Sequence, residues 1–600
     1  MNRHIEKALP HADPLWVEHG YGTRFQGFQN LMRLRIRDIL LVSSLYDLYV
    51  FEEDGRLYEL MREKYQELNL SHAPELTRVS NGDEAIALIQ EERRFDLLIT
   101  TLHIEDMSVP MFAKRVRDAG IEIPIVLLAF DNRELADLIT HGAADVFDEV
   151  FIWNGNFRLL LAIVKHLEDK MNVDHDTNLV GVQSIIVVED NVRFYSYFLP
   201  IIYLEVMKQS QRLISEGINL SHKQLRQRAR PKILFCKSFE EAWAYYEKFD
   251  ETILGIISDV NFPRNGKADR EAGLELARRV WEQHPDIPIL FHSSQPKNET
   301  LAKLIGASFV LKNSPTLMDD FREFLIHDLS FGDFIFRTHD GREVGRAQDL
   351  VSLEKVLHHV PEDSIVYHAE RNHFSNWLKA RTEFWLAHKL RPRKISDYAS
   401  VEETRRTLIR ELRDYRKLRQ RGIITDFDKD SFDPYSSISR IGEGSLGGKA
   451  RGLSFVNILI NNYNVQHRYK DVRIYIPPAI VIGTDIFDAF IAENHLLEFA
   501  LNATDDRAII QRFLDAKKFP EDILGELVSY LDLVQSPLAI RSSSLLEDSH
   551  NQPFAGVYDT IMLPNSNPDA LIRLRELLQA IKRVYASTFL KSAKDYIKAT

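Results

Sequence analysis

The feature that most constrains the fold is a repeated alternation of short apolar runs with segments of helical length. In residues 38–170 the apolar runs are DILLVSS, RRFDLLITTL, IPIVLLAF and DVFDEVF. The same order recurs in residues 180–330, with QSIIVVEDN, LGIISDVNFP, IPILFHSSQ and GASFVLKNS. Short apolar strands that alternate with helices predict a parallel sheet covered by helices on both faces. The sequence therefore predicts a multidomain α/β protein with two tandem doubly wound domains, the second repeating the first.

Length and composition limit the architecture and the function. With 600 residues, of which 44% are hydrophobic and 27% charged, the chain is typical of a folded protein with several domains. The net charge of −12 argues against general nucleic-acid binding. A single cysteine, Cys236, excludes an internal disulfide framework and suits a reducing compartment. Because we find neither a signal peptide nor an apolar run of ~18–20 residues, we expect a cytoplasmic protein without a membrane or nucleic-acid partner.

Polar residues follow the strands of the second domain at the ends where ligands of parallel sheets bind. Glu189 and Asp190 follow the first strand and Asp259 ends a central one, so their carboxylates should meet. A hard cation such as Mg2+ prefers oxygen ligands of this kind. Ser293 and Lys312 come at the ends of the next two strands, where they could contact a phosphoryl group on Asp259. The alternative is that these polar groups only decorate the strand ends.

In this order and spacing, the polar positions resemble the response-regulator receiver family, whose fold is flavodoxin-like. The resemblance implies a phosphoacceptor, a Mg2+ site, a switch region, and a cognate histidine kinase or another phosphodonor as partner. The residues that it implies are Asp259 as phosphoacceptor, Glu189, Asp190 and Asp259 as metal ligands, and Ser293 and Lys312 as the switch. A long insertion at about residues 205–232 departs from the family pattern. We expect its basic stretch, HKQLRQRARPK, to be a solvated helix rather than a nucleic-acid-binding arm.

The first domain repeats the strand pattern of the receiver family without its chemical groups. Ser43 and Ser44 stand where the acids belong, and Thr101 replaces the aspartate. Ala129 replaces the hydroxyl residue, and we place Glu149 near the position of the lysine. Without an acidic cluster there is no cation site, and a threonine is a poor acceptor in this chemistry. We therefore interpret the first domain as a pseudo-receiver with a structural or docking role.

For residues 331–429 we predict a mostly helical connector. Residues 1–37 show no strong hydrophobic period, and we interpret them as a leader. FGDFIFRTHDGREVG predicts a hairpin with its turn at Asp340 and Gly341. Three helical stretches follow: LVSLEKVLHHV, HFSNWLKARTEFWLAHKL and VEETRRTLIRELRDYRKLRQR. The last could couple domains, form a homodimer or be a solvated connector, which we favour because its leucines do not sustain a heptad series. The histidines of this region lack metal-binding spacing, so we expect them in the core or on the surface.

Two stretches near the C-terminus carry groups that suit phosphate. In ISRIGEGSLGGKARGLSFVNILI, a glycine-rich turn can wrap an anion, Lys449 adds a positive charge, and the following helix directs its amides to the same place. It is not a Walker loop, because Ala450 follows the lysine. PLAIRSSSLLEDSHNQPFAGVYDTIML predicts a strand, a polar loop and a strand, with Arg541, serines and Gly556 suited to phosphate. The alternative for this stretch is an ordinary hairpin with a solvated loop.

Together these stretches resemble the N-terminal nucleotide-binding domain of the phosphoenolpyruvate synthase and pyruvate phosphate dikinase family. That family has a GGKGxNL-like stretch, a proline-bearing strand followed by a threonine, and a VRSSA..ED....FAG...T stretch, which about residues 430–600 match in order. The resemblance implies the first part of an ATP-grasp-type domain, ATP and Mg2+ as cofactors, and Lys449 and Arg541 as catalytic groups that neutralise phosphate charge. The nucleotide-binding residues that it implies are Gly447, Gly448, Lys449, Arg541, Ser542, Gly556 and Thr560.

Departures from that family leave two functions open. Ala450, Arg451 and Gly452 replace the family's Gly-x-Asn, and no second half of the nucleotide domain, histidine domain or phosphoenolpyruvate domain follows Thr600. We therefore expect the chain to be the front part of a longer polypeptide. The first function is an ATP-dependent phosphotransferase, regulated by the receiver, that passes a phosphoryl group through a histidine to pyruvate. The second is a non-catalytic two-component signalling protein whose phosphorylated receiver controls a nucleotide- or partner-binding module.

Overall fold

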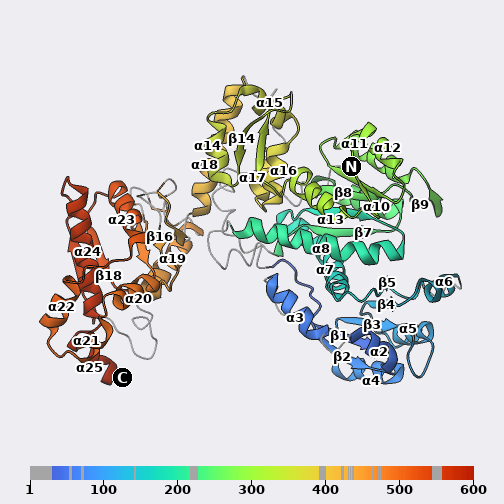
Figure 1. The fold of residues 1–600 in the computed structure, drawn as a ribbon, viewed down its shortest axis with the longest axis horizontal. Helices are drawn as coiled ribbons and strands as arrows, with labels where there is room; N and C mark the ends of the chain where they lie inside the picture. Colours follow the sequence, from blue (N-terminus) through green and yellow to red (C-terminus); the bar gives the residue numbers. More distant parts are fainter. Residues whose placement is uncertain are drawn as a thin grey trace. The chain divides into compact units, whose positions relative to one another are not determined.

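A computed structural model of the chain divides into two compact units, an N-terminal unit within residues 26–413 and a C-terminal unit within residues 414–600 (Figure 1). The residues that the structure describes are 30–52, 57–68, 70, 73–140, 144–215, 228–390, 400–420, 424–429, 432, 434, 438–462, 465, 468–469, 472, 474–543 and 557–599.

The first sheet of the N-terminal unit is parallel and has the strand order β2-β1-β3-β4-β5. Alternate residues of β1 belong to different clusters of apolar side chains. Ile39 and Leu41 belong to one cluster, and Leu40 and Val42 belong to the other. The sheet is therefore buried on both faces, as its near-continuous apolar strands predict. The elements are β1 (Asp38–Val42), α2 (Leu45–Glu52), α3 (Leu57–Glu67), β2 (Glu75–Val79), α4 (Gly82–Glu92), β3 (Leu97–Thr101), α5 (Val109–Asp118), β4 (Ile125–Ala129), α6 (Asn132–Thr140) and β5 (Glu149–Ile152).

The second sheet repeats this topology with the order β12-β11-β8-β6-β7. In both sheets the first strand of the domain lies between the second and the third, so the predicted repeat and the doubly wound α/β class are confirmed. The elements are β6 (Ser184–Val188), α8 (Val192–Ser215), β7 (Lys232–Cys236), α10 (Phe239–Phe249), β8 (Ile253–Asp259), a β9 (Phe262–Arg264) and β10 (Lys267–Asp269) hairpin, α11 (Ala272–Gln283), β11 (Ile289–Ser293), α12 (Asn298–Ile305), β12 (Ser308–Leu311) and α13 (Leu317–Glu323).

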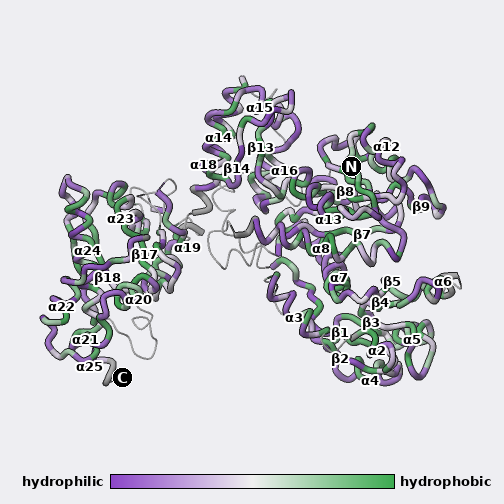
Figure 2. The backbone as a smooth tube through the Cα atoms, in the orientation of Figure 1, coloured by the Kyte–Doolittle hydropathy of each residue, from purple (hydrophilic) through white to green (hydrophobic). Residues whose placement is uncertain are grey.

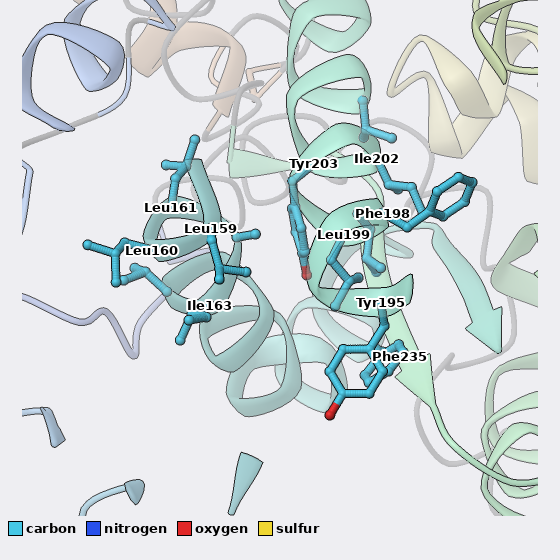
Figure 3. Packing of buried hydrophobic residues seen from close by; sticks show 14 of the residues in the cluster. Leu159, Leu160, Leu161, Ile163, Tyr195, Phe198, Leu199, Ile202, Tyr203 and Phe235 are labelled. Carbon is cyan, nitrogen blue, oxygen red and sulfur yellow. The ribbon is translucent and has the colours of Figure 1, made fainter. Parts of the chain in front are cut away.

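A long helix, α7 (Arg158–Val180), joins the two domains and packs against α8 and β7 of the second. Figure 3 shows Leu159 of α7 on the side that faces Leu199 and Tyr203 of α8. These side chains belong to one apolar cluster that also contains residues of the first sheet. The two doubly wound domains therefore share part of their core.

Buried charges hold the start of β7 against α7. The Arg230 guanidinium donates to both carboxylate oxygens of Asp169, at 2.9 and 2.8 Å, and the Lys232 ammonium lies 2.7 Å from Asp176. These four side chains are at most 5% exposed. The prediction that the basic stretch is solvated is therefore wrong for Arg230 and Lys232, whose charges are compensated inside the fold. Residues 216–227, the middle of the predicted insertion, lie outside the described residues.

The end of the predicted leader runs along α7. The Met32 amide donates to Asp176, the Leu34 amide to Asn172, and the Ile36 amide to Glu168. This segment forms neither helix nor strand, so its backbone amides lack the hydrogen bonds of regular structure. Polar residues buried on α7 accept from these amides instead. The rest of the leader, residues 1–29, lies outside the described residues.

The connector folds back on itself through a hairpin and helices. The predicted hairpin is confirmed, with Gly341 at a φ of +83° in its turn. HFSNWLKARTEFWLAHKL forms two helices rather than one, and α15 was not predicted. The last helix is not simply solvated, because Leu408 and Leu412 are buried and Arg405 donates to the carbonyls of Leu357 and Val360. The elements are β13 (Phe334–Arg337), β14 (Glu343–Ala347), α14 (Leu350–Leu357), α15 (Glu362–Glu370), α16 (His373–Ala380), α17 (Phe384–Leu390) and α18 (Val401–Gln420).

The C-terminal unit combines a parallel sheet, β15-β16-β17, with the β18-β19 hairpin and several helices. Helix α24 alternates hydrophilic and hydrophobic residues along its length (Figure 2) and buries Leu577, Ile581 and Val584. The elements are β15 (Ile424–Asp426), β16 (Ile438–Ile441), α19 (Gly447–Asn462), β17 (Ala479–Ile482), α20 (Thr484–Glu493), α21 (Leu497–Asn502), α22 (Asp506–Leu514), α23 (Glu521–Leu533), β18 (Leu538–Arg541), β19 (Thr560–Leu563), α24 (Ala570–Ser587) and α25 (Lys591–Ala599). Within the described ranges, no helix has both the length and the apolar character needed to cross a membrane.

Candidate functional site

An acidic cluster lies at the carboxyl ends of β6 and β8. These strands are neighbours, so Glu189 and Asp190, which follow β6, meet Asp259, the last residue of β8. One carboxylate oxygen from each residue lies within 4.8 Å of the others. In the described part of the chain this is the only group of three or more acids, histidines or cysteines that could hold one metal ion. The predicted meeting of these side chains is confirmed.

Lys312 sits among these acids, directly after β12. Its ammonium lies 2.6 Å from Asp259 Oδ2 and 2.5 Å from Glu189 Oε2, and 4.3 Å from the centroid of the Phe194 ring. Burial raises the pKa of Glu189 to about 7, although Lys312 acts to lower it, and the Asp259 carboxylate adds to the rise. Three carboxyl groups thus share one ammonium group in this cluster. Oxygen ligands of this kind fit a hard divalent cation such as Mg2+.

The carboxylate of Asp259 is held by its own loop. Asp259 Oδ1 accepts from the Val260 amide at 2.6 Å, while Oδ2 faces Lys312. A Cβ added at Gly273 would lie 2.4 Å from the Asp259 carbonyl oxygen, so glycine is required for α11 to approach this loop. The orientation of Asp259 is thus fixed by contacts on both of its oxygens.

Ser293 ends β11, the strand next to β8, and is buried. Its hydroxyl oxygen accepts from Asn298 Nδ2 at 2.9 Å and from the Gln295 amide at 3.2 Å. The residue before it, His292, is buried with Nδ1 3.5 Å from Glu189 Oε2, and burial lowers the pKa of its imidazole to about 3. Sequence reasoning missed His292 and Asn298. A polar residue within the apolar run IPILFHS was the available signal for the histidine.

At the equivalent edge of the first sheet, the described residues form no acidic cluster. Backbone hydrogen bonds identify the equivalent positions: the amides of Ser43 and Glu189 donate to the last residue of the neighbouring strand, Val79 or Cys236. Thr101, which ends β3, donates its hydroxyl to that of Ser43 at 3.1 Å, and Ser43 donates to the carbonyl of Ser44, so neutral groups satisfy this edge.

The prediction for the lysine position of the first domain was wrong. Strand β5 begins at Glu149, so Glu149 lies at the opposite end of the strand from the equivalent of Lys312. The Trp153 amide donates to Ala129 as the Lys312 amide donates to Ser293, which makes Trp153 the equivalent residue. The apolar residues before Glu149 suggested an earlier strand.

The helix that carries Phe194 also contacts the first domain. The Tyr195 hydroxyl donates to the carbonyl of Val150, and the Ile152 amide donates to Ser196 Oγ at 2.9 Å. Val150 and Ile152 belong to β5, the edge strand of the first sheet. Consecutive residues of α8 therefore contact the lysine of the acidic cluster on one side and the edge of the first sheet on the other.

In the C-terminal unit, the two predicted phosphate-binding stretches contact each other. Ser543 Oγ accepts from the Ala450 amide at 3.1 Å and donates to the Leu446 carbonyl at 2.7 Å. Gly447 has a φ of +73°, and a Cβ there would lie 1.1 Å from the Ser543 carbonyl oxygen. The first turn of α19, which carries Gly448 and Lys449, therefore packs directly on the segment after β18.

The second stretch forms the predicted strands. Arg541 ends β18 and is paired in register with Thr560, which begins β19. Both residues are exposed, and Ser542 follows Arg541 directly. Gly556 lies in the segment 544–556, outside the described residues.

Comparison with known proteins supports the C-terminal assignment. Residues 443–600 match the family model described as "Pyruvate phosphate dikinase, AMP/ATP-binding domain". This match confirms the resemblance that the two glycine- and serine-rich stretches predicted. A search of curated proteins finds no match to the chain.

Two solved structures of proteins assigned as two-component system response regulator/GGDEF domain proteins also match. They have TM-scores of 0.22 with 15% and 14% identity, and each match covers 49% of this chain and 98% of the other.

Proposed function

We propose that this chain is an ATP-dependent phosphotransferase of the phosphoenolpyruvate synthase and pyruvate phosphate dikinase type, regulated by phosphorylation of Asp259 in its second receiver domain. The observation that carries the proposal is that two features occur in one chain. One is the acidic cluster with Lys312, and the other is the match of residues 443–600 to an AMP/ATP-binding domain. The first supplies an acceptor for a phosphoryl group, and the second a site for a nucleotide.

In the receiver, an oxygen of Asp259 attacks the phosphorus of a phosphohistidine or an acyl phosphate. The new oxygen–phosphorus bond forms as the bond to the leaving imidazole nitrogen or carboxylate oxygen breaks, and a departing imidazole takes up a proton from solvent. Lys312 and the Ser293 hydroxyl bind oxygens of the transferred group. Glu189, Asp190 and Asp259 would hold Mg2+, which neutralises negative charge on the carboxylates and the phosphoryl oxygens when bound.

In the nucleotide domain, Lys449 and Arg541 bind the phosphate chain of ATP and neutralise its charge. Both are cationic, and the contact of Ser543 with Leu446 and Ala450 brings their segments together. Neutralisation and positioning account for most of what a protein contributes to phosphoryl transfer. Passage of the group through a histidine to pyruvate belongs to this proposal by resemblance to the family.

The pseudo-receiver serves as a docking domain in this proposal. Phosphorylation of Asp259 draws Lys312 toward the phosphoryl oxygens, which changes the contact of its ammonium with Phe194. Tyr195 and Ser196, the next residues of α8, hold β5 of the first domain. Phosphorylation of Asp259 would therefore move α8 and, through its hydrogen bonds, β5 at the edge of the pseudo-receiver sheet.

The experiment is a nucleotide assay on the full chain with and without an acyl phosphate and Mg2+. We expect ATP to bind, phosphorylation to change the rate of AMP formation in the presence of pyruvate, and Asp259→Asn to remove that change. ATP binding that responds to phosphorylation without any turnover favours the alternative, a signalling protein with a nucleotide-binding module. Absence of ATP binding contradicts both.

A further inference from the structure

A carboxylate closes the glycine-rich turn that precedes α19. Asp485 Oδ2 accepts from the Glu443 amide at 2.9 Å, and Oδ1 accepts from the Gly444 amide at 2.8 Å. The Thr484 hydroxyl oxygen accepts from the next amide, that of Ser445, at 3.0 Å. These acceptors stand in the first turn of α20, far along the sequence from the amides that they bind.

The glycines of the turn are required by this carboxylate. A Cβ added at Gly442, Gly444 or Gly483 would lie 2.8, 2.7 or 2.3 Å from an Asp485 carboxylate oxygen. Gly442 also has a φ of +86°, a conformation that disfavours other residues. Burial acts to raise the pKa of Asp485, yet the amides of Glu443 and Gly444 hold it below its ordinary value.

This arrangement corrects one expectation about the turn. Its amides were expected to wrap a phosphate, but those of Glu443 and Gly444 already donate to Asp485. A bound phosphate would have to displace a carboxylate of the same sign of charge. A group of the protein itself therefore already satisfies these two amides.

The same turn fixes the start of the helix that carries Lys449. Ser445 Oγ accepts from the Gly447 amide at 3.4 Å, and α19 begins at Gly447. On its other side the first turn of α19 is held by Ser543, through Leu446 and Ala450. The place of Lys449 is therefore set by Asp485 from one direction and by the segment of Arg541 from the other.

We propose that Asp485 is a positioning residue for nucleotide binding, which holds the glycine-rich turn so that Lys449 reaches the phosphate chain of a nucleoside triphosphate. The inference rests on the proposed ATP site. Because Asp485 acts through Lys449, its loss matters for the polyphosphate and not for the nucleoside. An asparagine offers one acceptor oxygen where two amides require two, so Asp485→Asn loosens the turn with little change in side-chain volume.

The test is a double-mutant cycle on the full chain, with displacement of a fluorescent ATP analogue by ATP or by adenosine. We expect Asp485→Asn to weaken ATP binding about tenfold and leave displacement by adenosine unchanged. Lys449→Ala should weaken ATP binding by at least as much, and the double variant should bind ATP no more weakly than Lys449→Ala alone. Asp488→Asn removes the same charge from an exposed position of α20 and should bind ATP like the wild type.

Three results overturn the inference while the wild type binds ATP: unchanged affinity of Asp485→Asn, tighter binding by that variant, or losses that add in the double variant. Additive losses would show that Asp485 only stabilises the fold. Thr484→Val removes the acceptor of the Ser445 amide and provides a milder variant if Asp485→Asn does not fold. It should weaken ATP binding in the same direction, and unchanged binding by Thr484→Val would also count against the role of the turn. Failure of the wild type to bind ATP overturns the proposed function itself.

Discussion

The two doubly wound domains of the N-terminal unit have one strand order and equivalent backbone hydrogen bonds, yet among the described residues only the second carries an acidic cluster. At the ends of equivalent strands, Thr101 bonds to Ser43 in the first domain, while Asp259 faces Lys312 in the second. The neutral pair is satisfied within the fold. In the acidic cluster, three carboxyl groups face one ammonium group. Binding of a cation or attachment of a phosphoryl group would alter this balance of charge.

The same strand order can therefore carry different side chains at the carboxyl ends of its strands. The apolar strands that build both sheets are similar in burial, and the substitutions concern side chains that stand at the strand ends. A fold of this class places ligands at that edge, but the side chains there decide whether a ligand is bound.

The largest expected effect is all or none. Asp259→Asn removes the acceptor oxygen, so incubation with an acyl phosphate and Mg2+ should add one phosphoryl group to the wild type and none to the variant. Intact-mass spectrometry measures this directly. Thr101→Ala, at the equivalent position of the first domain, is the matched control and should be labelled like the wild type; equal labelling of Asp259→Asn would show that the acceptor lies elsewhere.

Removal of the buried ammonium should have the next largest effect. Lys312→Ala leaves Glu189 and Asp259 without their cation and should lower the free energy of unfolding by about 3 kcal/mol without Mg2+. Denaturant unfolding, followed by hydrogen exchange in β6 and β8, measures the loss. Lys303→Ala breaks an exposed pair with Glu299 and should cost less than about 0.5 kcal/mol. A similar cost for both variants would mean that Lys312 is not a partner of the cluster.

Mg2+ should stabilise the second domain and not the first. At about 100 times its dissociation constant, a ligand of the folded state adds about 2.7 kcal/mol. We expect a gain of this order in hydrogen-exchange protection of β8, largely lost in Asp190→Asn, with no change in β3. Ser44→Ala, at the position equivalent to Asp190, should keep the full gain. Protection of both sheets by Mg2+ would contradict the distinction between them.

The smallest effect is expected in the first domain. Thr101→Val keeps the shape of the side chain and removes the hydroxyl that bonds to Ser43, at a cost of about 1 kcal/mol in the free energy of unfolding. Mg2+ stabilisation and labelling of Asp259 should not change. A loss of either would mean that the edge of the first sheet supports the chemistry of the second.

The acidic cluster could be predicted from the sequence because it depends on strand ends. Each of its residues directly follows or ends an apolar run, and a parallel sheet brings such positions to one edge. The hairpin at Gly341 and the repeat of the doubly wound domain depend on similarly local or repeated patterns. The match of residues 443–600 agrees with motifs that were visible as spaced residue types.

What the sequence could not show depends on contacts between distant segments. Arg230 and Lys232 lie in a basic stretch typical of a solvated surface, and only the acids of α7 make their burial possible. The sequence does not distinguish Asp485 from other acids on helices. Only the structure shows that it accepts from the amides of Glu443 and Gly444. The lysine position of the first domain was misplaced because β5 begins later than its apolar residues suggest.

The central claim is that the side chains at the sheet edge act together, so that an aspartate alone does not make an acceptor. The most direct measurement is intact-mass and peptide mapping of Thr101→Asp after incubation with an acyl phosphate and Mg2+. We predict one phosphoryl group per chain, on Asp259, because the first domain still has Ser43 and Ser44 in place of acids and Trp153 in place of lysine. A second phosphoryl group, mapped to position 101, would contradict the account.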